Sequence, residues 1–503
     1  MARKWWTLVA VCVATFMLLV DITIVNVALP AIQRDLKSSL TDLQWVVDAY
    51  TLPLAALLLT AGSLADRLGR RRVFVAGVAV FTLASVLCGL ASTPLFLNLA
   101  RALQGTGGAA MLATALALIA QEFSGRERGT AIAAWGATIG AAVAIGPLVG
   151  GALTEHLGWE WIFFVNAPVG VFAVAVALAR TGESLNRDAG RPDWIGLVTF
   201  SGALFLLVFG LLRGNAEGWS SALISGSLIG AAVLLCTFTI FERRQQRPML
   251  DLSLFRKPAF AGVSAATFAI GSGMFAMFLY LTLYLQDVLG LSPLAAGLRF
   301  LPLTVVSFFV AMASGRLSAR LPARALLGCG LVLVSLGLLL MHGVQPSSEW
   351  TTLLAGLIVA GIGIGLANPA IAGTALGVVP PARSGMASGI NNTFRMGGVA
   401  TGIAALGAVF EQRIESKLAQ LVPNAPDGLS AAVASGGSRA AARAAPPAGR
   451  HQVVDAAQEA FTSSLNEVLL IGAATALVGS LCAFALIRAR DFHKQPVPEP
   501  AKP

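Results

Sequence analysis

Long apolar stretches alternate with short polar ones along nearly the whole chain. A helix needs about 20 apolar residues to cross the hydrocarbon core of a bilayer, and stretches of about that length recur fourteen times. We therefore predict an all-α membrane protein with fourteen transmembrane helices. The predicted spans are 5–29, 43–64, 73–91, 95–119, 130–152, 161–180, 194–212, 221–241, 260–285, 294–314, 325–343, 351–379, 385–410 and 466–488.

The polar connections predict how these spans are oriented. Lys and Arg are concentrated in alternate connections, and the most basic of them is the glycine-containing turn at residues 62–74. Short loops rich in Lys and Arg remain in the cytoplasm. Because the number of predicted spans is even, both termini are expected on the cytoplasmic side.

Composition agrees with a multi-pass membrane protein. The chain has 503 residues, of which 56% are hydrophobic and 12% charged, and its mean hydropathy is +0.76. This leaves no soluble catalytic domain. The net charge of +10 lies in short loops, so it indicates orientation and not nucleic-acid binding. The five cysteines all lie in apolar segments, which predicts neither disulfides nor a metal site. The excess of Arg over Lys favours a bacterial source.

An internal repeat appears when the chain is shifted by about 255 residues. The basic segment 315–324 then falls on residues 62–71, and Gly361 and Gly363 fall on Gly105 and Gly107. Two related six-helix halves are therefore expected, and parallel repeats of this kind suit a transporter that rocks about a central cavity.

The offset also spans two further segments, which we interpret as an insertion between the halves. The predicted division is an N-terminal six-helix bundle at 1–180, two inserted transmembrane helices with cytoplasmic linkers at 181–257, a C-terminal six-helix bundle at 258–490 that includes a long extracellular loop at 411–465, and a disordered cytoplasmic tail at 491–503.

Three charged residues lie within predicted spans of the first half: Asp21, Asp48 and Arg101. Charge inside a bilayer is costly and usually has a function. Counting 1.5 Å per helical residue, all three lie near one level, with Asp21 roughly 12 Å below the outer end of its span. In the repeat, Arg101 corresponds to Leu357, and Asp21 to an apolar run near Met274. The first half therefore holds charges that the second half lacks.

A carboxylate in such a position can exchange a proton when a neighbouring arginine or a substrate moves. We predict that Asp21 couples proton movement to transport, with Arg101 as its charge partner and Asp48 closer to the substrate route. The alternatives are a packing or capping contact from Asp21 to Thr23 or Asn26, and a solvated position for Asp48. Arg299 and Arg395 have two interpretations, as substrate contacts or as ties between the bundles.

The fifth span is rich in small residues. It contains Gly146, Pro147, Gly150 and Gly151, and small side chains let transmembrane helices approach closely. Proline also removes a backbone hydrogen bond and favours a kink. We expect this segment to set the packing of span five against the opposite bundle.

Several of these motifs resemble those of the major facilitator superfamily, and in particular its fourteen-span drug:proton antiporters. The resemblance covers essentially the whole chain. The motifs are the turn GSLADRLGRR at 62–71, LVDITIVNVALP at 19–30, ARALQG at 100–105, GPLVGG at 146–151 and WIFFVNAPVG at 161–170.

The resemblance implies roles for individual residues. It assigns Arg101 to proton transfer and residues 146–151 to the antiporter motif, and it makes the basic turn a gate between conformations. The gating residues are Gly62, Asp66, Arg67, Gly69 and Arg70. The substrate-cavity candidates are Asn26, Gln104, Asn166 and Arg395.

The function expected from these features is export of hydrophobic or cationic drugs or antibiotics in exchange for protons, by alternating access. The protein is expected to be a monomer in the bacterial cell membrane, with protons, the lipid bilayer and a small substrate as its partners and with no cofactor or metal.

Two alternatives are a proton-coupled uptake symporter on the same fold and a membrane sensor that transports nothing. The antiporter motif argues against the first. An ATP-driven pump is disfavoured because no Gly-x-x-x-x-Gly-Lys loop occurs. An enzyme is disfavoured because all four histidines fall in loops or at span ends.

Overall fold

The computed structural model of the chain describes residues 2–38, 40–184, 193–245, 250, 252–318, 320–380, 384–422, 429–434 and 450–492. Every element in this part of the chain is helical. The first group of helices is α1 (Arg3–Leu36), α2 (Leu40–Leu68), α3 (Arg70–Gly89), α4 (Pro94–Glu122), α5 (Gly125–His156), α6 (Trp161–Phe164) and α7 (Asn166–Arg180).

Two helices follow, α8 (Trp194–Glu217) and α9 (Ala222–Arg244). The last group is α10 (Pro258–Ile270), the π-helical turn η2 (Gly271–Phe275), α11 (Ala276–Leu283), the π-helical turn η3 (Tyr284–Val288), α12 (Pro293–Arg299), α13 (Leu301–Leu317), α14 (Ala323–Leu340), α15 (Leu354–Gly377), α16 (Ser384–Leu421), α17 (Leu429–Ala434) and α19 (Arg450–Leu486). Short 3-10 turns precede α10 and α15 and follow α19.

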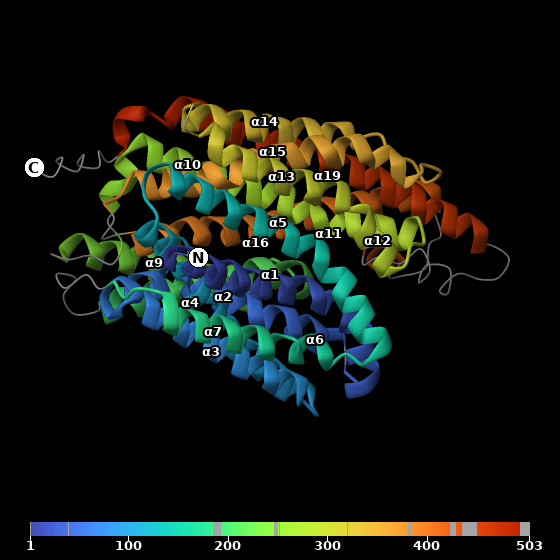
Figure 1. Cartoon of the computed structure of the whole chain (residues 1–503). Coiled ribbons are helices and arrows are strands. Elements are labelled where there is room, and N and C mark those ends of the chain that lie inside the picture. The colour runs from blue at the N-terminus through green and yellow to red at the C-terminus, as the bar shows by residue number, and fades with distance from the viewer. Residues whose placement is uncertain are drawn as a thin grey trace, which may run out of the picture.

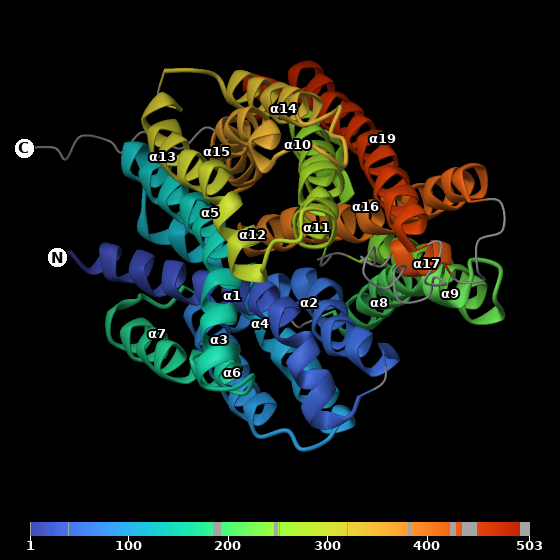
Figure 2. The same cartoon turned by 90° about the vertical axis from the view of Figure 1, so that its right-hand side faces the viewer.

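The helices lie side by side in two groups (Figure 1). Figure 2 shows the molecule end on: α1–α4, α6 and α7 form one group, and α10–α15 and α19 form the other. Helix α5 reaches across to α13, and α16 reaches across to α2 and α4. Helices α8 and α9 lie at one side, where α8 contacts both α2 and α16.

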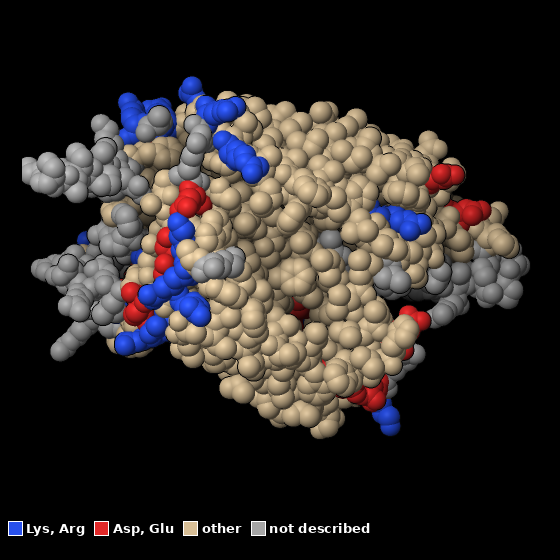
Figure 3. All heavy atoms as spheres, in the orientation of Figure 1, with Lys and Arg blue, Asp and Glu red and all other residues tan. Residues whose placement is uncertain are grey.

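Helix length and composition agree with a membrane protein. Among the described residues, twelve helices are long and apolar enough to cross a membrane, and α13 is a shorter apolar helix. Helices also cover every predicted span, since α5 and the α12–α13 pair occupy the remaining two. On the face shown in Figure 3, charged side chains are concentrated toward the two ends, with a broad uncharged surface between them.

Two predicted loops are helical in the structure. Of the predicted turn at 62–74, only Gly69 lies outside a helix, because α2 continues to Leu68 and α3 begins at Arg70. The predicted bounds of the long loop at 411–465 are wrong at both ends, since α16 continues to Leu421 and α19 begins at Arg450. These extensions are polar, so hydropathy did not find them. Contacts between the two helices stabilise them: Phe410 packs on Phe461, and Arg413 pairs with Glu467. The predicted tail beyond residue 492 lies outside the described residues.

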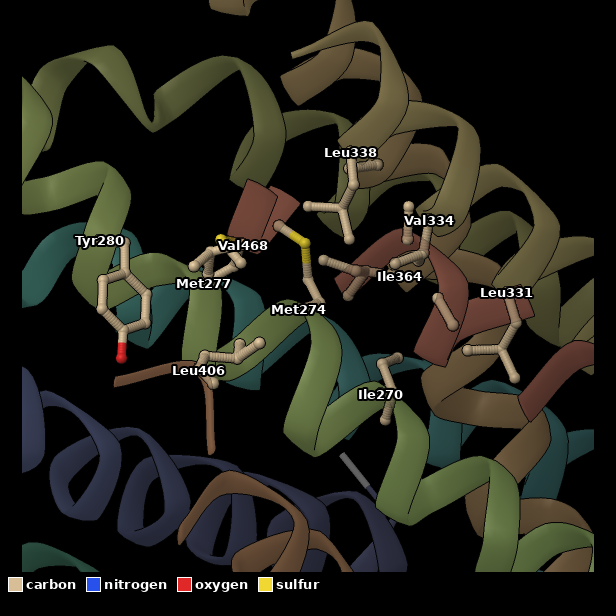
Figure 4. Close-up of a cluster of buried hydrophobic side chains, with 14 of the residues drawn as sticks. Ile270, Met274, Met277, Tyr280, Leu331, Val334, Leu338, Ile364, Leu406 and Val468 are labelled. Atoms are coloured by element: carbon tan, nitrogen blue, oxygen red, sulfur yellow. The ribbon is translucent and has the colours of Figure 1, made fainter. Parts of the chain in front are cut away.

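The first long helix of the second half contains one π-helical turn, η2, between α10 and α11, and ends in a second, η3. Side chains from this helix meet others from α14, α15, α16 and α19 in an apolar cluster (Figure 4). Glycines bring the backbones together here. A Cβ on Gly402 would lie 2.5 Å from the carbonyl oxygen of Ser272, and one on Gly273 would lie 2.9 Å from that of Gly472. Such π-helical turns are frequent at functional sites.

The repeated glycines make equivalent contacts in the two halves. Gly105 packs on the backbone of α2 and Gly107 on α3, whereas Gly361 packs on α13 and Gly363 on α14. Small residues are required at all four positions, because any side chain would collide with a neighbouring helix.

Candidate functional site

The centre of the candidate site is the carboxylate of Asp21, which is 0% exposed in α1. Oδ2 accepts a hydrogen bond of 2.5 Å from Nη1 of Arg101. Oδ1 accepts from Nε2 of Gln104 at 2.8 Å and from Nδ2 of Asn166 at 3.1 Å. Helices α1, α4 and α7 therefore meet at one buried carboxylate.

Arg101 is fixed by further contacts. Its Nε donates to the backbone oxygen of Val46 at 3.1 Å, and its guanidinium lies 4.2 Å from the ring centroid of Tyr50. Ser85 in α3 accepts from Gln104 at 2.6 Å and from Asn166 at 3.2 Å. The site thus joins five helices, and a charged hydrogen-bonded pair is stable at such depth only when its remaining donors and acceptors are also satisfied.

The pairing of Asp21 with Arg101 agrees with the sequence prediction. Gln104 and Asn166, predicted to line the substrate cavity, instead use their amides on Asp21 and Ser85. Ser85 and Tyr50 were not predicted as site residues, because a lone serine or tyrosine in an apolar span is common and gives no distinct signal.

Asp48 does not join this network within the described part of the chain. Its Oδ2 lies 3.8 Å from Nη1 of Arg213 in α8, and Nη2 of Arg213 donates to Glu217 at 2.8 Å. The guanidinium of Arg213 also lies 5.4 Å from the ring of Trp45. Asp48 is therefore at the α2–α8 contact. Arg213 was overlooked although the signal was present, since it is a charged residue directly after a predicted span.

The basic turn connects three parts of the chain. Asp66 accepts from Nη2 of Arg70 at 2.9 Å and from the backbone nitrogen of Met386 at 3.1 Å. Gly69 adopts a φ of 108°, which favours glycine, and the carboxylate of Glu183 covers it. Arg67 has Asp193 and Glu242 of the inserted segment as electrostatic neighbours. Gly62 lies buried within the last turns of α2.

The antiporter motif packs differently from the prediction. Gly146 contacts Thr23 and Gly150 contacts Ile24, so this part of α5 lies on α1 of the same half. The contacts of α5 with the opposite half lie nearer its start, where Gly129 lies against Gly315 and Gly136 lies against Pro369. The prediction was wrong because glycine spacing identifies the close-packing face of a helix but not the helix that faces it. The side chain of Pro147 lies outside the described ones, and Gly151 is partly buried.

Arg395 lies in α16 and is 5% exposed. Neither Nε nor Nη2 has a hydrogen-bond partner in the described part of the chain. Arg299 is partly buried, and its Nε also has no partner within the described residues, but its guanidinium lies 5.1 Å from the ring of Trp350. Asn26 belongs to α1, but its side chain is not among those described. No group of three or more His, Cys, Asp or Glu residues is placed to hold a metal ion where the structure describes the chain.

Comparisons with known proteins agree with this architecture. Residues 11–403 match the family described as Major Facilitator Superfamily. The tetracenomycin C resistance and export protein of Streptomyces glaucescens is 33% identical over 98% of this chain and 94% of its own. The multidrug efflux pump LfrA of Mycolicibacterium smegmatis is 34% identical over 95% of this chain and 96% of its own.

A solved structure supports the fold alone. The proton:xylose symporter XylE shares 12% identity with a TM-score of 0.63, over 96% of each chain. The protein is thus a multi-pass membrane protein of a transporter family, which confirms the expectation that it is not an enzyme. By the family match, the relatives and the fold together, the chain belongs to the major facilitator superfamily.

Proposed function

We propose that the protein exports a hydrophobic small molecule across the bacterial cell membrane in exchange for protons. The export direction and the drug class rest on the relatives, whose names describe antibiotic resistance, export and multidrug efflux. In this proposal the chain has fourteen spans and both termini in the cytoplasm. The halves 1–180 and 258–490 rock against each other, and α8 and α9 move with α2.

The observation that carries proton coupling is the set of donors around Asp21. Arg101, Gln104 and Asn166 all donate to its two oxygens. A proton bound to either oxygen would place an O–H group where a donor now points. The network must then rearrange, and because its members lie on α1, α4 and α7, protonation is linked to movement of helices.

Contacts near the basic turn hold the two halves together in the observed conformation, and this movement would have to break them. Asp66 of α2 accepts from the first turn of α16, and Gly129 of α5 contacts Gly315 of α13. In the sequence repeat, residues 385–387 fall on 129–131 and residues 315–324 fall on 62–71. The two contacts are therefore equivalent, and the halves meet through a related pair of contacts. Breaking and remaking both would alternate access to the space between the halves.

The experiment uses proteoliposomes and three dyes: cationic ethidium, neutral Nile red and anionic fluorescein. An imposed pH gradient should drive at least one dye against its concentration gradient, and a protonophore should abolish that movement. Movement of dye and protons in the same direction would favour the symporter alternative. Absence of gradient-driven movement for all three dyes would contradict the proposed function.

A further inference from the structure

Three polar residues of α16 lie on one face of the helix and are almost completely buried. Ser388, Asn391 and Arg395 are 0%, 3% and 5% exposed. Their spacing of three and then four residues places them above one another along the helix. Each has at least one polar atom without a hydrogen-bond partner in the described part of the chain.

The position of this face follows from the neighbouring contacts. Asn391 contacts Oγ1 of Thr267 in α10 at 2.8 Å through one end of its amide, and the other end has no described partner. Asn392 donates to the backbone oxygen of Leu112 in α4 at 3.3 Å. Arg395 lies one turn beyond both residues. It is therefore placed between α4 of the first half and α10 of the second.

Arg395 has no counter-ion within the described residues. The two carboxylates of the first-half spans are engaged elsewhere, Asp21 with Arg101 and Asp48 with Arg213. No carboxylate of the described residues is an electrostatic neighbour of Arg395. An uncompensated buried charge is strongly destabilising, so a fixed structural role does not account for it.

We propose that Ser388, Asn391 and Arg395 bind an acidic oxygen of the exported molecule, such as a phenolate, an enolate or a carboxylate. This inference rests on the proposed function and specifies its substrate class. The guanidinium supplies charge and the N–H donors of Nε and Nη2, which have no partner within the described residues, and the Ser388 hydroxyl supplies another donor. The adjacent residues Phe394 and Met396 belong to apolar clusters, so the rest of the ligand is hydrophobic. A cation is disfavoured because Arg395 repels it.

The test compares Arg395→Gln, Arg395→Lys and the parent protein with the same three dyes. Fluorescein combines an apolar ring system with a phenolate and a carboxylate. Its gradient-driven transport should fall about tenfold or more in Arg395→Gln, since the charged hydrogen bonds are lost. Ethidium and Nile red transport should be unchanged or faster, and Arg395→Lys should recover part of the fluorescein transport.

Arg299→Gln is the matched control, because Arg299 is also a span arginine but lies at the end of α12 and not on this face of α16, with its guanidinium 5.1 Å from the ring of Trp350. It should leave the ratio of fluorescein to ethidium transport unchanged. Thermal unfolding gives a second readout, in which Arg395→Gln should be at least as stable as the parent, because a buried unpaired charge is removed.

Three results would overturn the inference. The first is transport of ethidium or Nile red by the parent without transport of fluorescein, which leaves the proposed function intact. The second is an equal loss of all dyes together with lower stability in Arg395→Gln, which would make Arg395 a tie between the halves. The third is a difference in fluorescein transport between the parent and Arg395→Gln that is present in a gluconate buffer and disappears in a chloride buffer, which would make the occupant an inorganic anion.

Discussion

The backbone nitrogen of Met386 donates a 3.1 Å hydrogen bond to Oδ2 of Asp66. The last turn of α2 is thereby joined to the first turn of α16, in the opposite half. Backbone N–H groups in the first turn of a helix have no partner within the helix, and the helix dipole favours a carboxylate there. Asp66 meets both requirements while it is also paired with Arg70.

Replacing Asp66 by Ala should impair transport without preventing membrane insertion. The halves would lose a hydrogen bond to a charged group, which contributes about 1.5–3 kcal/mol. The conformation joined at this contact would then be roughly ten- to a hundredfold less populated. Gradient-driven dye transport and the amount of protein in the membrane fraction measure the two effects. Asp66→Asn, which keeps an acceptor oxygen, should be intermediate, and normal turnover in Asp66→Ala would contradict the proposed role.

Asp21→Asn should fold but lose proton-driven export. Asparagine can still accept from Arg101, but it cannot take up a proton at physiological pH. We expect transport under an imposed pH gradient to fall at least about tenfold, since the coupling step is removed. Arg101→Gln is a contrasting variant, because it leaves a buried carboxylate unpaired and should lower stability by about 3–5 kcal/mol. Undiminished proton-coupled export in Asp21→Asn vesicles would remove Asp21 from the mechanism.

Asp48→Asn should change which dyes are carried more than the rate of proton coupling. The structure adds that Arg213→Gln should have a related effect, because the two side chains lie 3.8 Å apart. A double-mutant cycle on dye selectivity should give a coupling of about 0.5–3 kcal/mol, as is usual for residues in contact. Additive effects of the two substitutions would show that the α2–α8 contact is not used in selectivity.

Gly150→Leu should disturb the packing of α5 on α1. Even a Cβ at this position would lie 2.7 Å from Cγ1 of Ile24. Overpacking of this kind costs about 1–3 kcal/mol, and displacement of α1 would also move Asp21. We expect lower thermal stability and faster proton leakage from proteoliposomes. Gly373→Ala is the control, since a Cβ there would meet nothing within 4 Å. A fully active Gly150→Leu protein that does not leak protons would show that α5 and α1 can move apart here without loss of function.

The sequence alone determined the fold class, the positions of the helices and the residues that carry charge into the spans. Hydropathy is a property of each segment, so it located the apolar helices, including the twelve described ones long enough to cross a membrane, without knowledge of their neighbours. The repeat was visible because equivalent glycines satisfy the same steric requirement in both halves. The shared level of Asp21 and Arg101 followed from counting residues, because the rise per residue of a helix is constant.

Only the tertiary structure decided which helix faces which. The sequence placed Asp48 near the level of the other two charges but could not show its partner, and in the structure the rotation of α2 directs it to Arg213 of α8. Gly146 and Gly150 form a close-packing face, yet the choice of α1 over the opposite half depends on the arrangement of the whole bundle. The same holds for Arg395. The sequence shows that its charge lies within a predicted span, where charge is costly, but only the packed structure shows that no described residue compensates that charge. Periodicity fixes the faces of a helix, whereas the partner of each face depends on long-range contacts.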